Sequence, residues 1–263
     1  MQWLPVEILR AILACCAADH LHTIAAVCHE WEKATRDRRG SIAKLWDVPL
    51  NIKNPLTCTS MWFENGNPIG YNGAIVFAEA VGSGALPFLT HLDLGENQIG
   101  DIGVTALASA LGNGALPLLT ILGLGGNQIG DSGIDVLATA LGSGALPLLT
   151  KLLLRGNQIG NAGLSSLSTA LGNGALASLQ QLWMNSNRIG DDGVAALASA
   201  LANGALPSLT YLHLDGNDIG DEGMIAFSAA LANEAMPRIV YIGTFGNPGR
   251  GALIDEALAA RNA

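Results

Sequence analysis

The sequence predicts an α/β solenoid, in which one short unit of strand and helix repeats along the chain. The first observation is a strict 30-residue period of asparagines, at Asn67, Asn97, Asn127, Asn157, Asn187, Asn217 and Asn247. The second is that residues 114–142 and 144–172 are nearly identical units. The third is that each unit changes from a strand pattern to a helix pattern at the same place. A fixed period of this length is typical of solenoids.

The first half of each unit predicts a short strand with one buried face. Leu92 and Leu94 alternate with His91, Asp93 and Gly95, which is the two-residue period of strands. A single unit cannot bury its own leucines, so its neighbours must supply the walls of the core. We therefore expect a continuous ladder of buried leucines, formed by Leu92, Leu122, Leu152, Leu182 and Leu212.

The second half of each unit predicts a helix with one apolar stripe, which includes Leu107, Ala108 and Leu111 in one of the units. Paired glycines such as Gly112 and Gly114 suit a left-handed helix end and the turn back to the next strand. An acid or amide stands where an N-cap side chain would accept hydrogen bonds from free backbone amides, at Asp101, Asp131, Asn161, Asp191 and Asp221.

The recurring asparagine is predicted to be structural. It is polar at a position otherwise surrounded by apolar residues. Its amide can hydrogen-bond the backbone where the chain turns, and that backbone would otherwise be buried without partners.

The pattern LxxLxLxxNxIxxxG that begins at Leu89, followed by a helical half, resembles a leucine-rich repeat. The repeat length and the regular helix resemble the ribonuclease-inhibitor type. The resemblance covers residues 59–263, as about seven 30-residue units with a C-terminal cap. It implies a curved horseshoe with parallel strands on the concave side and helices on the convex side.

The first 46 residues have no such repeat and predict a small all-α module, joined to the solenoid by a linker at 47–58. Two apolar helical stripes support this prediction. The first contains Leu9, Ile12, Leu13 and Cys16, and the second contains Leu21, Ile24, Val27, Cys28 and Trp31.

The same segment resembles an F-box. The resemblance rests on LPxEILxxIL from Leu4, VCxxW from Val27 and the Leu45-Trp46 pair, in that order. It departs from the family at Cys16, where a larger aliphatic residue is usual, and at His20, where Asp is common. The family implies docking on the linker protein of a cullin-type (SCF) ubiquitin ligase, with the repeats selecting the substrate. The residues that would contribute to docking or to the module's own core are Pro5, Ile8, Ile12, Val27 and Trp31.

Charge and cysteine content narrow the functional classes. Residues 61–263 contain six Lys or Arg and sixteen Asp or Glu, and an acidic solenoid argues against nucleic-acid binding while leaving room for a basic protein partner. The cysteines form no CxxC pair that would suggest zinc, and adjacent Cys15 and Cys16 are a poor disulfide framework. No stretch is long enough to span a membrane, and the apolar run at 11–18 has no basic segment before it. We expect a cytoplasmic protein, with a nuclear location also open.

Strand positions on the concave side break the repeat and predict a binding site. Parallel neighbours lie about 4.8 Å apart, so residues in successive units touch. An aromatic cluster is expected from Trp183, Tyr211, His213, Tyr241 and Phe245, flanked by Lys151 and Arg155. Exposed aromatic residues beside arginine are typical of a binding hot spot. The alternative is that these rings only pack on one another.

We expect no enzymatic activity and no cofactor. His213 and Asp215 share one strand face, as do His91 and Asp93, but the repeat places no Ser or Cys nucleophile beside either pair. The glycine-rich loops lack the lysine and the spacing of a phosphate loop.

The sequence therefore leaves two alternative functions. The first is a substrate-recognition adaptor of an SCF ubiquitin ligase, which binds the linker protein through residues 1–46 and a substrate through the concave face. The second is a free-standing scaffold, inhibitor or GTPase regulator whose N-terminal helices only cap the solenoid. In both, the partners are proteins rather than nucleic acid or membrane, and the chain alone is expected to be monomeric.

Overall fold

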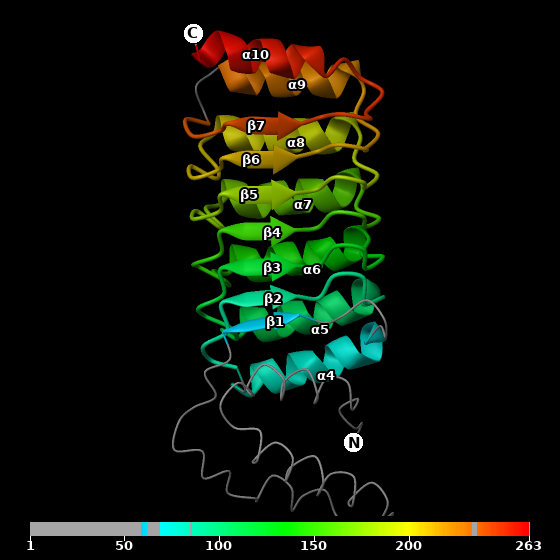
Figure 1. The fold of residues 1–263 in the computed structure, drawn as a ribbon, viewed down its shortest axis with the longest axis vertical. Coiled ribbons are helices and arrows are strands. Elements are labelled where there is room, and N and C mark those ends of the chain that lie inside the picture. The colour runs from blue at the N-terminus through cyan, green and yellow to red at the C-terminus, as the bar shows by residue number, and fades with distance from the viewer. Residues whose placement is uncertain (1–58, 63–68, 85, 233–235, 263) are drawn as a thin grey trace, which may run out of the picture.

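The structure, a computed structural model, describes residues 59–62, 69–84, 86–232 and 236–262 (Figure 1). Over these residues strands and helices alternate in seven units. The predicted helical module at 1–46 and the linker at 47–58 lie outside the described residues. The strands are β1 (Ser60–Trp62), β2 (His91–Asp93), β3 (Ile121–Gly123), β4 (Lys151–Leu153), β5 (Gln181–Trp183), β6 (Tyr211–His213) and β7 (Tyr241–Gly243). The helices are α4 (Gly70–Gly82), α5 (Gly100–Gly112), α6 (Asp131–Gly142), α7 (Asn161–Gly172), α8 (Asp191–Ala202), α9 (Asp221–Ala232) and α10 (Ala252–Asn262).

The strands form one parallel sheet in the order of the sequence, β1 to β7. Each strand pairs with the next without a slip, so that Leu92 lies opposite Leu122 and Leu122 opposite Leu152. This confirms the predicted leucine ladder, whose members are all fully buried: Leu92, Leu122, Leu152, Leu182 and Leu212. Met61 and Ile242 occupy the same position in the first and last described strands.

The helices form a second layer on one side of the sheet (Figure 1). Each turns its apolar stripe toward the sheet, as α5 does with the buried side chains of Val104, Leu107 and Leu111. In Figure 1 the helical layer extends beyond the sheet at both ends, since α4 lies outside β1 and α10 outside β7. The helical layer is therefore the longer one, and the sheet lies on the inner side of the curve, as the leucine-rich-repeat resemblance implies.

The asparagines bind each unit to the next. Oδ1 of Asn127 accepts from the backbone N–H of Asn97 at 2.9 Å and, less closely, of Ile99 at 3.4 Å. Its Nδ2 donates to the carbonyls of Leu94 at 2.8 Å and Gly125 at 3.2 Å. One amide thus satisfies buried backbone groups of two units. Similar bonds across the unit boundary recur at Asn157, Asn187, Asn217 and Asn247. The structural role predicted for the asparagines is confirmed for these residues, whereas Asn67 lies outside the described residues.

The predicted N-cap role of the acidic residues is wrong. Asp131 is the first residue of α6, and the N-cap residue is Gly130, which has no side-chain cap. The acid belongs to the first turn, and its side chain accepts from the N-cap glycine of the following unit. Oδ1 of Asp101 accepts from the N–H of Gly130 at 2.7 Å. Equivalent bonds at 2.7 Å join Asp131 to Gly160, Asn161 to Gly190 and Asp191 to Gly220.

The left-handed turns after the helices are confirmed at the second glycine of each pair. Gly114 has φ of 88° and Gly144 has φ of 95°, a conformation that glycine adopts without the steric penalty of a Cβ. The chain then reverses through residues such as Leu116, which is buried, and enters the next strand.

The last unit ends in α10, which packs on α9 (Figure 1). Ile254 of α10 is fully buried. Arg261 donates to the carbonyls of Met236 at 2.6 Å and Ile239 at 3.0 Å. Arg250 stands where earlier units have glycine, and both its N–H and its Nε donate to Asp221. These bonds, the backbone N–H first, lower the pKa of the Asp221 carboxyl.

We predict that Asn157→Ala lowers the free energy of unfolding by roughly 2–4 kcal/mol, because buried backbone groups of two units lose their partner. Urea denaturation followed by circular dichroism measures this change. Asn247→Ala is the matched control at the end of the ladder, where the side chain is only partly buried. Equal losses of unfolding free energy from both substitutions would contradict the prediction that a central asparagine contributes more stability than the last one.

Candidate functional site

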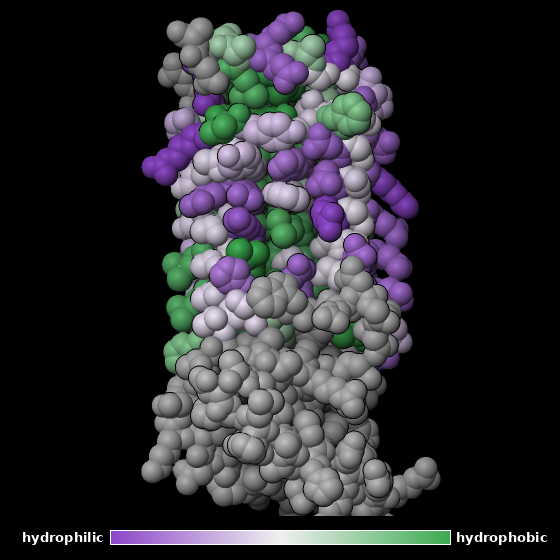
Figure 2. Space-filling model, viewed as in Figure 1, coloured by the Kyte–Doolittle hydropathy of each residue, from purple (hydrophilic) through white to green (hydrophobic). Residues whose placement is uncertain are grey.

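The side chains that point from the strands away from the helices form the sheet face, which Figure 2 shows from the front. Two rows follow from the strand register. Lys151, Gln181, Tyr211 and Tyr241 form one row, and Leu153, Trp183, His213 and Gly243 form the next. Residues two positions further on, Arg155, Asn185, Asp215 and Phe245, continue the face beyond the strands. These are the positions at which otherwise similar units differ most.

The structure brings most of the predicted aromatic residues together. The rings of Trp183 and His213 lie 4.6 Å apart between centroids, and those of His213 and Tyr241 lie 5.1 Å apart. Tyr211 is the register partner of Tyr241. Tyr211 and Tyr241 remain 40% and 44% exposed, so they pack only in part. We name Trp183, Tyr211, His213 and Tyr241 the aromatic cluster.

Phe245 does not pack into the aromatic cluster as the sequence predicts. Its side chain is 89% exposed. Its backbone N–H donates to Oδ1 of Asp215 at 3.0 Å, so the carboxylate fixes the backbone of Phe245. Phe245 therefore stands at the edge of the sheet face, beside the cluster.

A glycine makes room for the acid that supports His213. Oδ2 of Asp215 lies 3.6 Å from Nδ1 of His213. The carboxylate occupies the space that a side chain at Gly243 would fill, because a Cβ there would collide with it. His213 is thus held between two rings and a carboxylate, which are the contacts of a packed side chain. These contacts supply no nucleophile.

Two polar atoms in the centre of the sheet face have no hydrogen-bond partner. They are Nε1 of Trp183 and Oδ1 of Asn185, and both are buried. An unpaired buried donor or acceptor costs about 1–3 kcal/mol relative to a paired one. The sequence analysis did not select Asn185, although its place between Arg155 and Asp215 on the same row was a usable signal.

Lys151 begins β4, whereas Arg155 lies two residues beyond its end, and the two side chains have different surroundings. Lys151 is in register with Gln181, and Leu153 with Trp183. Arg155 leans the other way, toward the loop that follows β3, where its Cγ would lie 3.0 Å from a Cβ at Gly125. That Lys151 flanks the cluster stays a prediction, whereas Arg155 lies across the preceding unit.

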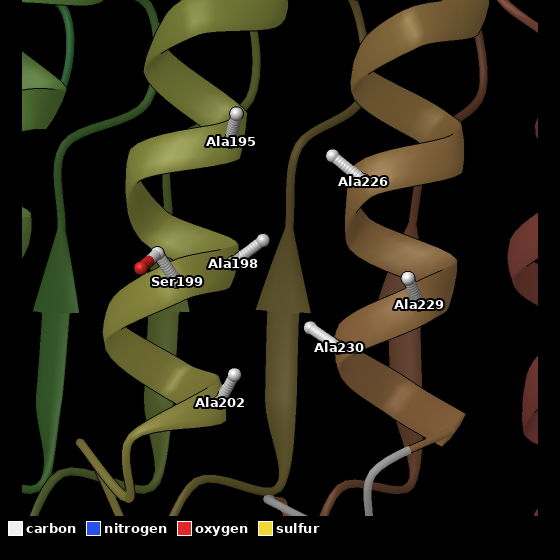
Figure 3. Close-up of a pocket in the computed structure, with 7 residues that line it drawn as sticks. All are labelled: Ala195, Ala198, Ser199, Ala202, Ala226, Ala229 and Ala230. Atoms are coloured by element: carbon white, nitrogen blue, oxygen red, sulfur yellow. The ribbon is translucent and has the colours of Figure 1, made fainter.

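Two other surfaces of the solenoid are mainly apolar. A shallow groove between α8 and α9 is lined by methyl groups and one hydroxyl (Figure 3), from Ala195, Ala198, Ser199, Ala202, Ala226, Ala229 and Ala230. Apolar side chains also gather along the edge where the strands begin, on the left of Figure 2. The large exposed ones in the loops that lead into the strands are Phe88, Leu118, Leu148 and Val240. Within the described ranges, no group of His, Cys, Asp and Glu could hold a metal ion. No helix described by the structure is both long enough and apolar enough to cross a bilayer.

The family model for the leucine-rich repeat matches the chain five times, over residues 85–108, 115–138, 145–168, 175–198 and 205–228. The matches and the parallel sheet backed by helices identify the chain as a solenoid built from leucine-rich repeats. Its assignment to the ribonuclease-inhibitor type stays a prediction. Residues Pro5, Ile8, Ile12, Val27 and Trp31, which the F-box resemblance selected for docking, lie outside the described residues.

Solved structures show similarity at low sequence identity. The actin-binding site 2 of leiomodin-1 is 15% identical with a TM-score of 0.41, covering 70% of this chain and 86% of that one. Internalin C2 of Listeria monocytogenes is 20% identical with a TM-score of 0.39, covering 71% and 80%. The ectodomain of the Arabidopsis thaliana receptor kinase GASSHO1/SCHENGEN3 is 16% identical with a TM-score of 0.28, covering 63% and 25%. A comparison with curated proteins gave no match.

We predict that Gly243→Ala displaces the Asp215 carboxylate and breaks its bond to the N–H of Phe245, at a cost of about 1 kcal/mol. Amide hydrogen exchange at Phe245 should accelerate, and Asp215→Ala should reproduce the effect. Gly112→Ala is the control, because its added Cβ would meet only ordinary contacts near Ala140. Unchanged exchange at Phe245 in Gly243→Ala would show that the carboxylate is not what orders this edge.

Proposed function

We propose that this chain, a protein-interaction module by virtue of its leucine-rich repeats, binds a protein partner on its sheet face at the aromatic cluster and Phe245. The observation that supports this most is that large aromatic side chains replace the repeat pattern at adjacent positions of the face. The units at residues 114–142 and 144–172 are by comparison nearly identical. Tyr211 and Tyr241 stay close to half exposed although they are neighbours, and Phe245 is almost fully exposed. Exposed aromatic side chains of this kind serve as anchors in protein interfaces.

The proposal includes no catalytic step. His213 is surrounded by rings and a carboxylate, and Lys151 and Arg155 supply positive charge to the same face. Such a set fits recognition of another protein, in which a few large anchors contribute most of the binding energy.

We further propose that residues 1–46 dock on the linker protein of an SCF ubiquitin ligase, which would make the chain a substrate-recognition adaptor acting in the cytoplasm or nucleus. The support is the sequence resemblance to an F-box, through the LPxEILxxIL and VCxxW patterns. Pro5, Ile8, Ile12, Val27 and Trp31 would form the docking surface or the core of this module. The solenoid would then present its sheet face to the substrate.

The docking proposal predicts that the purified chain forms a one-to-one complex with the linker protein, and that Val27→Ala combined with Trp31→Ala abolishes it. A pull-down with light scattering measures complex formation, and circular dichroism checks that the double variant is folded. Normal binding by a well-folded double variant would refute the docking role.

Deletion of residues 1–46 separates an adaptor from a free-standing scaffold whose N-terminal helices are a cap. Loss of an independent docking module leaves the solenoid soluble, with a cooperative melting transition. Loss of a cap exposes the first ladder and lowers the melting temperature or causes aggregation. The second outcome would favour a scaffold, inhibitor or GTPase regulator.

The sheet-face proposal predicts that the double substitution Tyr211→Ala with Tyr241→Ala weakens partner binding. The expected loss of binding free energy is about 2 kcal/mol or more in total, as for hot-spot residues. Affinity capture from cell extract with quantitative mass spectrometry measures the loss. The matched control is Ile102→Ala with Ile225→Ala, which removes exposed apolar side chains from the helical layer. Identical capture profiles for both double variants would place the binding surface elsewhere.

A further inference from the structure

We propose that the sheet face binds an acidic, extended segment of its protein partner. Carboxylates of that segment pair with Lys151 and Arg155, and a large apolar side chain of the same segment packs on the aromatic cluster. This inference rests on the proposed function, because it names the chemistry of the partner for the same face. An acidic partner differs from what the net charge of the chain suggests. That charge is −9 and by itself would favour a basic partner.

Among the described residues, the two cations of the sheet face have no charged or hydrogen-bonded partner, whereas two of its carboxylates do. Lys151 and Arg155 form no ion pair or side-chain hydrogen bond with another residue in the described part of the chain. In contrast, Asp93 accepts from the N–H of Gly95 at 2.9 Å, and Asp215 accepts from the N–H of Phe245 at 3.0 Å. The acids serve the fold, whereas the cations remain available to a partner.

Much of the remaining negative charge is also engaged away from this face. Asp101, Asp131, Asp191 and Asp221 belong to the first helical turns, and each accepts a backbone N–H from the following unit. Charges that are separated by more than about 8–10 Å are largely screened at physiological salt. Local complementarity at the sheet face therefore decides which segment binds there.

Glycines at and just after the end of β3 leave the backbone beneath Arg155 without side chains. The side chain of Arg155 lies across Gly125, and the neighbouring positions Gly123 and Gly126 also lack side chains. Asp93 and Glu96 fill part of that space from the preceding unit. The arginine side chain thus lies against the backbone of a glycine, and Arg155 stays exposed.

The spacing of these groups suits one short extended segment. β4 and β7 are three strand spacings apart, or about 14 Å, and an extended chain advances about 3.3 Å per residue. A carboxylate at β4 and an apolar side chain at Tyr241 would therefore be about four residues apart. The partner segment should contain an acidic residue and a large apolar residue at this separation.

Two unpaired atoms at the end of β5 and just beyond it lie on the path of such a segment. Nε1 of Trp183 can donate to a backbone carbonyl, and Oδ1 of Asn185 can accept from a backbone N–H. Both atoms are covered by protein in the free chain, so neighbouring side chains must turn aside when the segment binds. A peptide backbone is the ligand that offers both complementary groups.

The test is selection of random linear dodecapeptides displayed on phage against the full chain. We expect selected peptides to be enriched in Asp and Glu, with an aromatic or aliphatic residue about four positions away. Lys151→Ala with Arg155→Ala should weaken their binding about tenfold and reduce its dependence on salt. Arg188→Ala is the matched control, because Arg188 is an exposed cation in a loop, outside the strands.

The outcomes separate this inference from the proposed function. Peptides that require Tyr211 and Tyr241 but show no acidic enrichment, or that are basic, would overturn the acidic partner and leave the sheet face as a binding site. Selected peptides indifferent to Tyr211→Ala with Tyr241→Ala would overturn both proposals. A failure to select any peptide that binds the wild-type chain would also count against both.

Discussion

The hydrogen bonds of the recurring asparagine are the constraint on which the rest of the solenoid depends. Each side chain from Asn127 to Asn247 joins its own unit to the preceding one through backbone donors and acceptors that the core would otherwise leave unpaired. Because these bonds connect residues 28 or 33 positions apart, they fix the period of the chain. The strands then stay in register without a slip. Because of this register, variable side chains that are 30 or more residues apart in the sequence meet on one face.

The fold was predictable because its information is local and repeated. The strand and helix periods, the leucine ladder and the structural asparagines all follow from patterns within one unit. The role of the acidic residues was not predictable in this way. Asp101 has the type and position of an N-cap residue, but its partner is the N–H of Gly130 in the following unit. A cap and an inter-unit bond look alike in sequence, and only the stacking distance between units decides between them.

The candidate site was predictable in membership but not in detail. Period and strand spacing place Trp183, His213 and Tyr241 together, and their rings do meet. The direction of Arg155 depends on the missing side chain of Gly125, and the position of Phe245 depends on a carboxylate from the preceding unit. The directions of these side chains depend on residues about 30 positions away in the sequence. They also depend on glycines, which leave space that neighbouring side chains fill.

The near identity of residues 114–142 and 144–172 has a consequence for how such a chain can change. Removal or duplication of one whole unit would replace every inter-unit bond by an equivalent one, so the solenoid would tolerate it. The aromatic cluster would then shift relative to β1 by one strand spacing, about 4.8 Å, with a small rotation. The number of central units thus sets the distance between the first described strand and the aromatic cluster without altering either.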